Sequence, residues 1–201
     1  MLHDNWLERW LPLAVERAGT APVLEIGCGH GDDTATLAGA GLRVFAFDLS
    51  ALAVRMAKIR VASAVVECRD IRDPFPEQAQ ELGVVVASLS LHYFPWAETL
   101  VLAERVRAVL RPGGLLLCRL NSTEDKNFGA RGHAQIEPSY FMVDGSPKRF
   151  FDEPSVRNLF AAGWRVLSLE HFTTHKYLKP KSLWEVVLER DDSMPSPALR
   201  G

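Results

Sequence analysis

The sequence has few cysteines, no long apolar run and almost no net charge. Its three cysteines, Cys28, Cys68 and Cys118, fit no zinc-binding spacing, and their odd number argues against a disulfide framework. No run approaches the roughly 20 apolar residues that a membrane helix needs, and residues 1–10 lack the apolar core of a signal peptide. A net charge of −2 gives no overall field that would attract nucleic acid or an anionic membrane. We therefore expect a cytoplasmic protein with reduced thiols, no metal site and no nucleic-acid or membrane partner.

The length and composition are those of an ordinary globular domain. Of the 201 residues, 47% are hydrophobic and 24% charged, which is enough to bury a substantial core without disulfides. We predict a single domain over residues 1–190, with a helical segment at 1–20 and an irregular insertion at 121–150. Residues 191–201 are polar and contain two prolines, so we expect a flexible tail there.

Strand-like and helix-like segments alternate along the chain. Seven segments have the apolar pattern of strands: 23–26, 42–47, 64–68, 84–89, 115–120, 164–171 and 183–189. Helices are predicted at 32–40, 50–60 with Ser50 as the N-cap, 96–110 and 153–162. Alternation implies parallel pairing through right-handed crossovers, whereas the last two strands have no helix between them and should pair antiparallel. The prediction is an α/β fold with a doubly wound, mostly parallel seven-stranded sheet and an antiparallel C-terminal edge strand.

A glycine-rich loop follows the first predicted strand. Gly27, Gly29 and Gly31 follow the acid Glu25, and glycines in such a turn let the backbone approach a ligand closely. The second predicted strand leads to Asp48, whose carboxylate suits the two hydroxyl groups of a ribose. Together, the loop and this acid indicate a nucleotide cofactor bound at the carboxyl ends of the strands.

The start of the next helix bears on which nucleotide is bound. The dinucleotide pattern requires glycine at the sixth position of the loop, where this chain has Asp32. Asp32 and Asp33 would each repel a pyrophosphate by about 1 kcal/mol at an effective dielectric near 20, although they also complement the helix dipole. A cofactor with a ribose, a cationic centre and no phosphate fits better, and S-adenosylmethionine is such a molecule. The alternatives are an NAD(P)-dependent oxidoreductase and a non-catalytic S-adenosylmethionine-binding protein.

Several separate segments resemble the class I S-adenosylmethionine-dependent methyltransferases. The first is Glu-Ile-Gly-Cys-Gly-His-Gly at residues 25–31, and the others are residues 47–50, 69–71, 88–94, 110–114, 151–153 and 162–164. The family often has an acid at the start of the fourth strand, where this chain has Gly83. Residues 176–187 are similar to a subgroup that acts on small, soft acceptors, including the tellurite-resistance methyltransferases. The resemblance implies a Rossmann-like methyltransferase fold with S-adenosylmethionine as the cofactor.

The same resemblance implies a set of cofactor-binding residues: Glu25, Gly27, Cys28, Gly29, Gly31, Asp48, Leu49, Asp70, Ile71 and Ser88. The glycines would approach the methionyl part of the cofactor, and Glu25 would lie beneath that part and hold the loop or a water. Asp48 would bind the ribose, Leu49 and Ile71 would contact the adenine, and Asp70 would accept a hydrogen bond from its amino group.

The methyl acceptor is predicted to be a small molecule. His92, just after the fourth strand, is positioned to act as a general base, or else only to pack against and orient the acceptor. Tyr93 would shape the pocket, and His133 in the insertion on the acceptor side is a second candidate. Basic residues at 148, 149, 176, 179 and 181 form either a solvated face or a guide for an anionic acceptor. The Asp/Asn-Pro-Pro-aromatic segment of base-amino methyltransferases and the Pro-Cys nucleophile are absent, and the oligomeric state is left open.

Overall fold

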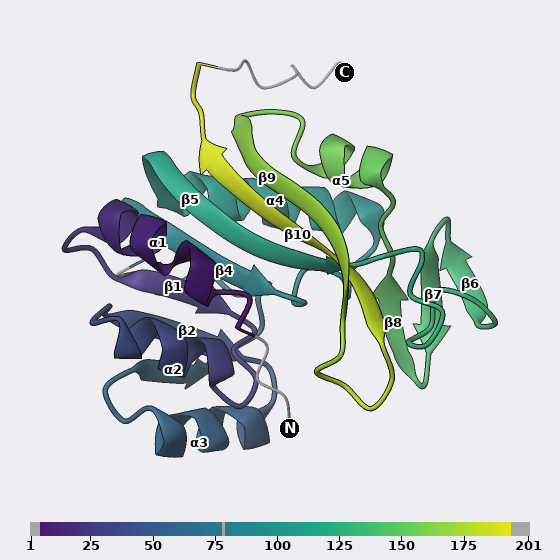
Figure 1. Ribbon diagram of the computed structural model, residues 1–201, viewed down its shortest axis with the longest axis horizontal. Helices are drawn as coiled ribbons and strands as arrows, with labels where there is room; N and C mark the ends of the chain where they lie inside the picture. The colour runs from purple at the N-terminus through teal and green to yellow at the C-terminus, as the bar shows by residue number, and fades with distance from the viewer. Residues whose placement is uncertain (1–4, 78, 194–201) are drawn as a thin grey trace.

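The chain folds into a seven-stranded sheet that is covered by helices on both faces (Figure 1). The computed structural model describes residues 5–77 and 79–193. The spatial order of the sheet is β3-β2-β1-β4-β5-β10-β9. Its strands are β1 (Val23–Ile26), β2 (Val44–Asp48), β3 (Val65–Cys68), β4 (Leu82–Ser88), β5 (Leu110–Asn121), β9 (Trp164–Thr174) and β10 (Lys181–Arg190). The α/β prediction and all seven predicted strands are confirmed.

The helices form one layer on each side of this sheet. The short 3-10 helix η1 (Glu8–Trp10) leads into α1 (Leu11–Ala18), which lies on the same face as α2 (Asp32–Gly39) and α3 (Ala51–Arg60). The opposite face is covered by α4 (Trp96–Val109) and α5 (Glu153–Leu159). Successive side chains of β5 point to opposite faces of the sheet. Leu115 and Leu117 pack on the face covered by α1, α2 and α3, whereas Leu116 and Leu120 pack on the face covered by α4 and α5. β4, at the centre, is buried on both faces, as its uninterrupted apolar run predicts.

The strand directions divide the sheet into a parallel part and an antiparallel end. β1, β2, β3, β4 and β5 pair in parallel, whereas β10 runs antiparallel to both β5 and β9. The C-terminal strand is therefore antiparallel, as predicted, and it lies one position inside β9. β5 begins at Leu110, five residues before its predicted start, because Leu110 already pairs with Leu82 across an irregular register.

Two local features, the N-cap of α3 and a glycine in β4, allow the helices to take these positions. The Ser50 hydroxyl accepts a hydrogen bond from Ala53 N and caps α3, as predicted. At Gly83, a Cβ atom would lie 1.8 Å from the carbonyl oxygen of Arg17 at the end of α1. Glycine at this position, where the family that the chain resembles often has an acid, therefore allows the close passage of α1 over β4.

The insertion predicted at 121–150 contains a small antiparallel sheet. Its strands are β6 (Ala134–Glu137), β7 (Tyr140–Val143) and β8 (Ser146–Arg149), and they lie beside the carboxyl end of β5 (Figure 1). A core of Ala130, Val143 and Phe150 holds this sheet together. These strands have only four residues each and polar outer faces, so their hydrophobic residues show no clear period. Composition alone therefore did not reveal them.

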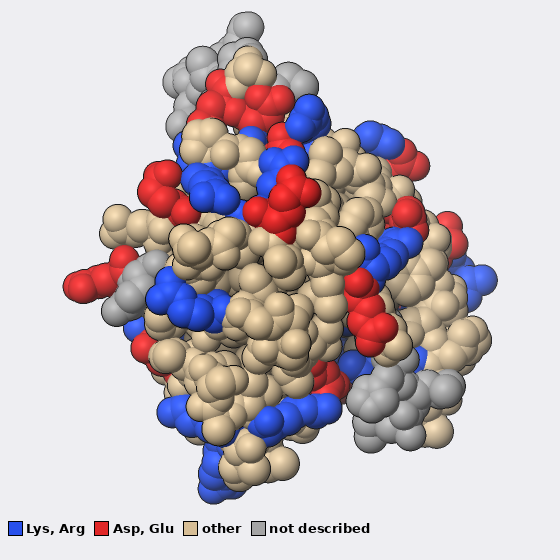
Figure 2. Space-filling view, turned by 60° about the vertical axis from the view of Figure 1, so that its left-hand side comes forward, with Lys and Arg blue, Asp and Glu red and all other residues tan. Residues whose placement is uncertain are grey.

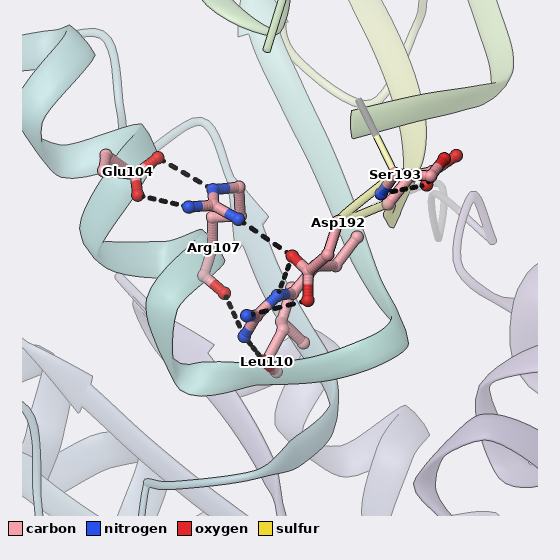
Figure 3. Close-up of polar contacts among 7 residues, drawn as sticks. Glu104, Arg107, Leu110, Asp192 and Ser193 are labelled. Carbon is pink, nitrogen blue, oxygen red and sulfur yellow. Dashed lines mark hydrogen bonds and ion pairs between the residues drawn. The ribbon is translucent and has the colours of Figure 1, made fainter. Parts of the chain in front are cut away.

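Polar contacts join the end of β10 to α4 (Figure 3). They lie at the opposite end of the strands from the carboxyl ends of the parallel strands. Arg107 donates to Glu104 at 2.8 Å and to Asp192 at 3.1 Å, and Arg190 donates to Asp192 at 2.9 Å. Of the tail predicted over 191–201, residues 191–193 are held here, and the rest lies outside the described residues. Over residues 5–77 and 79–193, no helix combines the length and apolar character that crossing a bilayer requires.

Candidate cofactor and acceptor site

A cavity of about 880 Å³ opens at the carboxyl ends of the parallel strands. Seven of the predicted site residues line it: Gly27, Gly29, Asp48, Leu49, Asp70, Ile71 and Tyr93. The other predicted residues lie outside its lining: Glu25, Cys28, Gly31, Ser88, His92 and His133. The crevice predicted from strand topology is thus where the structure places it.

The glycine loop is pressed between β2 and the segment that follows β4. Gly27 N and Cys28 N both donate to the carbonyl oxygen of Phe47, at 2.8 and 3.0 Å. Gly27 has φ +73°, and a Cβ atom there would lie 2.6 Å from Cβ of Ser90. Gly29 has φ +54° with no atom within 4 Å of its Cβ position, so this part of the loop borders open space. The two glycines therefore have different roles. A side chain at Gly27 would overlap Ser90, whereas a side chain at Gly29 would narrow the access from the loop to the cavity.

Asp48 joins the loop to the start of α3. One carboxylate oxygen accepts from Gly29 N at 2.9 Å and the other from Ser50 N at 2.8 Å. A carboxylate has about four lone-pair sites, so each oxygen keeps capacity for another donor from the cavity. Leu49, next along the chain, is 71% exposed and presents an apolar surface inside the same cavity.

The far wall of the cavity is formed by the loop after β3 and the start of α4. Asp70 accepts a hydrogen bond from Arg72 N at 2.9 Å, and Ile71 is buried beside it. The Arg72 guanidinium donates to Glu98 at 2.5 and 3.0 Å and lies 4.8 Å from the ring centre of Phe94. Sequence analysis did not single out Arg72 or Glu98, because an exposed ion pair has no motif of its own.

Two residues of the first motif, Glu25 and Cys28, are buried. Glu25 is buried and accepts a hydrogen bond of 2.6 Å from the Thr34 hydroxyl. Burial, together with the nearby charge of Asp33, raises the pKa of Glu25 well above its usual range. Burial also raises the pKa of the Cys28 thiol to about 12. Glu25 thus links β1 to α2, and its place beneath the cofactor stays a prediction.

The cysteines provide a direct check of this packing. We expect Cys68, the exposed thiol, to react with iodoacetamide at pH 8 at least about 100 times faster than Cys28 or Cys118, because the thiolate is the reactive form. Mass spectrometry of timed digests measures the three rates. Cys68→Ser should abolish the fast phase, and rapid labelling of Cys28 would contradict the buried position of the loop.

The segment after β4 brings strained and buried groups to the edge of the cavity. Leu89 has φ +55°, an uncommon conformation for a residue with a side chain, and Ser90 follows it in the cavity lining. His92 is only 4% exposed, and burial, reinforced by the charges of Lys181 and Lys148, lowers its pKa well below the usual range. Its ring lies 4.1 Å from that of Tyr93, which does line the cavity. His92 is therefore a buried residue that contacts Tyr93 and does not itself line the cavity.

Two further predicted residues, Ser88 and His133, do not line the cavity. The Ser88 hydroxyl accepts from Arg119 Nε at 2.9 Å, and His133 precedes β6 in the insertion. The insertion contributes Tyr140 and Pro147 to the lining instead. For Tyr140 and Pro147, the only signal in the sequence was the aromatic-rich composition of residues 121–150.

The N-terminal segment packs over the first turn of α2. The indole nitrogen of Trp6 donates to both carboxylate oxygens of Asp33, at 3.0 and 3.1 Å, and the Arg119 guanidinium lies 4.4 Å from its ring centre. Trp10 donates to Glu185 at 2.7 Å. Neither tryptophan lines the cavity, so packing is the role that the structure shows for both. Over the described residues, no group of three or more potential ligands could hold a metal ion.

Comparisons with known proteins agree with this architecture. The family described as "Methyltransferase domain" matches residues 23–114. An uncharacterized methyltransferase, sll0829, from Synechocystis sp. is 32% identical over 111 residues, which are 54% of this chain and 52% of that protein. The tRNA N(3)-cytidine methyltransferase METTL2 from Xenopus tropicalis is 27% identical over 157 residues, 71% of this chain and 46% of that protein. The chain spans about half the length of these curated relatives.

A solved structure extends the agreement in fold to most of the chain. It is the 1,6-didemethyltoxoflavin-N1-methyltransferase of Burkholderia thailandensis with 1,6-didemethyltoxoflavin and S-adenosylhomocysteine bound. Its TM-score is 0.68 at 18% identity, and the match covers 94% of this chain and 82% of that one. The chain therefore has the fold of this methyltransferase, and residues 23–114 are similar to the methyltransferase domain family.

Proposed function

We propose that this chain transfers a methyl group from S-adenosylmethionine to a small-molecule acceptor. The observation that carries the proposal is the 880 Å³ cavity, in which the glycine loop and Asp48 lie at one side and Tyr93 and Tyr140 at another. Such a cavity can hold a nucleoside cofactor and leave space for a second, compact ligand. The similarity of residues 23–114 to the methyltransferase domain disfavours the alternative of an NAD(P)-dependent oxidoreductase.

The residues present fit the cofactor. Asp48 lines the cavity with unused acceptor capacity, which suits the two ribose hydroxyls. Leu49 exposes its side chain where an apolar base could lie, with Ile71 and Asp70 on the same wall. The open space beside Gly29 leaves room for the methionyl part of the cofactor. When bound, the sulfonium supplies an electrophilic methyl group with a good leaving group.

The chain's own residues then have to align the acceptor and exclude water. In-line displacement gains most of its rate from holding the reacting atoms in position in a dry site. Tyr93 and Tyr140 provide apolar walls for that purpose. The role predicted for His92, as a general base or in orienting the acceptor, stays a prediction, because the imidazole is buried and lies outside the cavity lining.

A small acceptor is favoured over nucleic acid by the charge of the surface. Figure 2 shows acidic and basic side chains interspersed around a largely uncharged face, with no continuous basic stripe on that side. The net charge of −2 agrees with this view. The relative METTL2 carries tRNA cytidine methyltransferase in its name, so tRNA is the acceptor to be tested against small molecules. The likeness of residues 176–187 to the tellurite-resistance enzymes stays a prediction.

Two measurements test the proposal. Calorimetry should show binding of S-adenosylmethionine and S-adenosylhomocysteine, and no binding at millimolar concentration would overturn the cofactor assignment. The protein is then incubated with methyl-labelled donor and either a small-metabolite extract or total tRNA. We expect the label in the small-molecule fraction. Label in tRNA would contradict the acceptor class, and cofactor binding without any product would favour the non-catalytic alternative.

A further inference from the structure

One part of the cavity lining is built from uncharged residues of two neighbouring segments. We call these residues the uncharged wall: Tyr93, Phe94, Pro95, Tyr140, Ser146 and Pro147. The first three lie between β4 and α4, and the other three belong to the small sheet. The Tyr140 hydroxyl joins the two segments by donating to the carbonyl oxygen of Tyr93 at 2.9 Å. All six residues border the same cavity, so a ligand in it can reach them.

Tyr93 presents the largest accessible aromatic surface of the uncharged wall. It is 42% exposed, whereas Phe94 and Tyr140 are 6% and 3% exposed. Burial, followed by the charge of Asp48, raises the pKa of Tyr93, so the phenol lies within electrostatic range of the Asp48 carboxylate. Tyr93 therefore extends from the uncharged wall toward the end of the cavity where Asp48 and the glycine loop lie.

Two contacts fix Tyr93 in this position. The buried imidazole of His92 lies against its ring, with 4.1 Å between the ring centres and 38° between the planes. The Tyr93 carbonyl oxygen accepts from Tyr140, whose own ring centre lies 4.8 Å from the Arg149 guanidinium. Because both the side chain and the backbone of Tyr93 are held, a ligand that stacks on the ring does not have to order it first.

The charged part of the lining offers no unpaired cation. Its members are three acids and two arginines: Asp48, Asp70, Glu98, Arg69 and Arg72. Arg69 is paired with Glu67 at 2.8 Å, and Arg72 with Glu98 at 2.5 Å. None of the basic residues at 148, 149, 176, 179 and 181 belongs to the lining as the structure describes it. A small oxyanion would lose hydration here without gaining a free cation, so it is disfavoured.

We propose that the methyl acceptor is a small, uncharged aromatic compound whose ring stacks on Tyr93 and which carries its reacting oxygen or nitrogen on or next to that ring. This inference rests on the proposed function and names the acceptor class for the same cavity. Aromatic rings attract one another through their quadrupoles in addition to the apolar area that they bury, and a saturated ring of equal size lacks this contribution. The rest of the uncharged wall supplies apolar surface around the stacked ring.

The methyl transfer to such a compound balances without a further reactant. A lone pair on the acceptor's oxygen or nitrogen forms the new bond to the methyl carbon while the carbon–sulfur bond breaks. The electron pair of the broken bond stays on sulfur, which becomes a neutral thioether. The proton that the oxygen or nitrogen carried passes to water.

Binding of paired compounds to the complex with S-adenosylhomocysteine tests the aromatic preference. The probes are benzyl alcohol with cyclohexylmethanol, and 2-naphthylmethanol with its decahydro analogue, so that each pair carries the same reacting group. NMR titration of the protein measures the affinities. We expect the aromatic member to bind about 3-fold to 10-fold more tightly, and tellurite and phosphate not to displace it. Equal affinities within the pairs, no binding of either aromatic compound, or displacement by tellurite would overturn the proposal.

Tyrosine variants locate the preference. Tyr93→Leu keeps an apolar side chain without the ring, so the preference within each pair should disappear. Tyr93→Phe should retain it, because stacking does not require the hydroxyl. The control Tyr177→Ala removes a tyrosine outside the lining, whose ring centre lies 5.6 Å from that of Phe128, and it should retain the preference too. A preference that persists in folded Tyr93→Leu would contradict stacking on this ring.

The product of the wild-type protein gives a measurement that needs no variant. Methyl-labelled donor is incubated with a small-metabolite extract, and the labelled compound is isolated and identified by mass spectrometry and its ultraviolet spectrum. We expect an aromatic product. A saturated product or a methylated oxyanion would overturn the acceptor class, whereas failure of the wild type to bind S-adenosylhomocysteine would count against the proposed function itself.

Discussion

Replacing Gly27 with alanine is expected to weaken S-adenosylhomocysteine binding at least about 10-fold and to lower the free energy of unfolding by about 2–4 kcal/mol. Two effects add. The backbone has φ +73°, which strains any residue with a side chain, and the new Cβ would lie 2.6 Å from Cβ of Ser90. Ser90 is itself in the cavity lining, so relief of the overlap moves the loop or the segment after β4. Calorimetry and chemical denaturation measure the two quantities.

Two other glycines separate the causes of the Gly27 effect. Gly41 has φ +82° with no atom within 4 Å of its Cβ position, so Gly41→Ala carries only the backbone strain, about 1–2 kcal/mol, and should bind the cofactor normally. Gly29→Ala has the same strain but places a methyl group at the cavity, so it should fold and lose affinity. If Gly27→Ala behaves like Gly41→Ala, the contact with Ser90 does not shape the site.

The sequence predicted the location of the cavity well because that location depends on backbone geometry. Positive φ angles at Gly27 and Gly29 can be anticipated from glycine alone, and Asp48 ends a strand whose apolar pattern is plain. The carboxyl ends of parallel strands lie at the same edge of the sheet, and this holds whatever the exact length of each strand. Errors of a few residues at the strand ends therefore left the location of the cavity unchanged.

The acceptor side was harder to predict because it depends on side chains from distant segments. His92 was singled out by its place after β4, but its burial and lowered pKa come from packing and from Lys181, which lies far along the chain. Tyr140 and Pro147 line the cavity from the small sheet, and no motif marks either residue. Gly83 shows the reverse case, in which a departure from the family reflects contact with α1 rather than a change in the site.

Replacing Asp48 with alanine is expected to weaken S-adenosylhomocysteine binding by about 100-fold, since hydrogen bonds to a charged group contribute about 1.5–3 kcal/mol each. The carboxylate is proposed to accept from the ribose hydroxyls, and it already accepts from Gly29 N and Ser50 N. Asp152→Ala provides a control, because Asp152 caps α5 on the other side of the sheet. That variant should lose about 1 kcal/mol of stability and keep its affinity.

A change of ligand distinguishes ribose binding from anchoring of the loop. In the wild type, adenosine should bind more tightly than 2′,3′-dideoxyadenosine by about 10-fold or more, whereas in Asp48→Ala the two should bind equally. If Asp48 acted only by holding Gly29, the variant would weaken both ligands by the same factor and the preference for adenosine would persist. The cycle of two proteins and two ligands therefore measures the coupling between this carboxylate and the hydroxyls alone, because any general loosening of the loop cancels between the ligands.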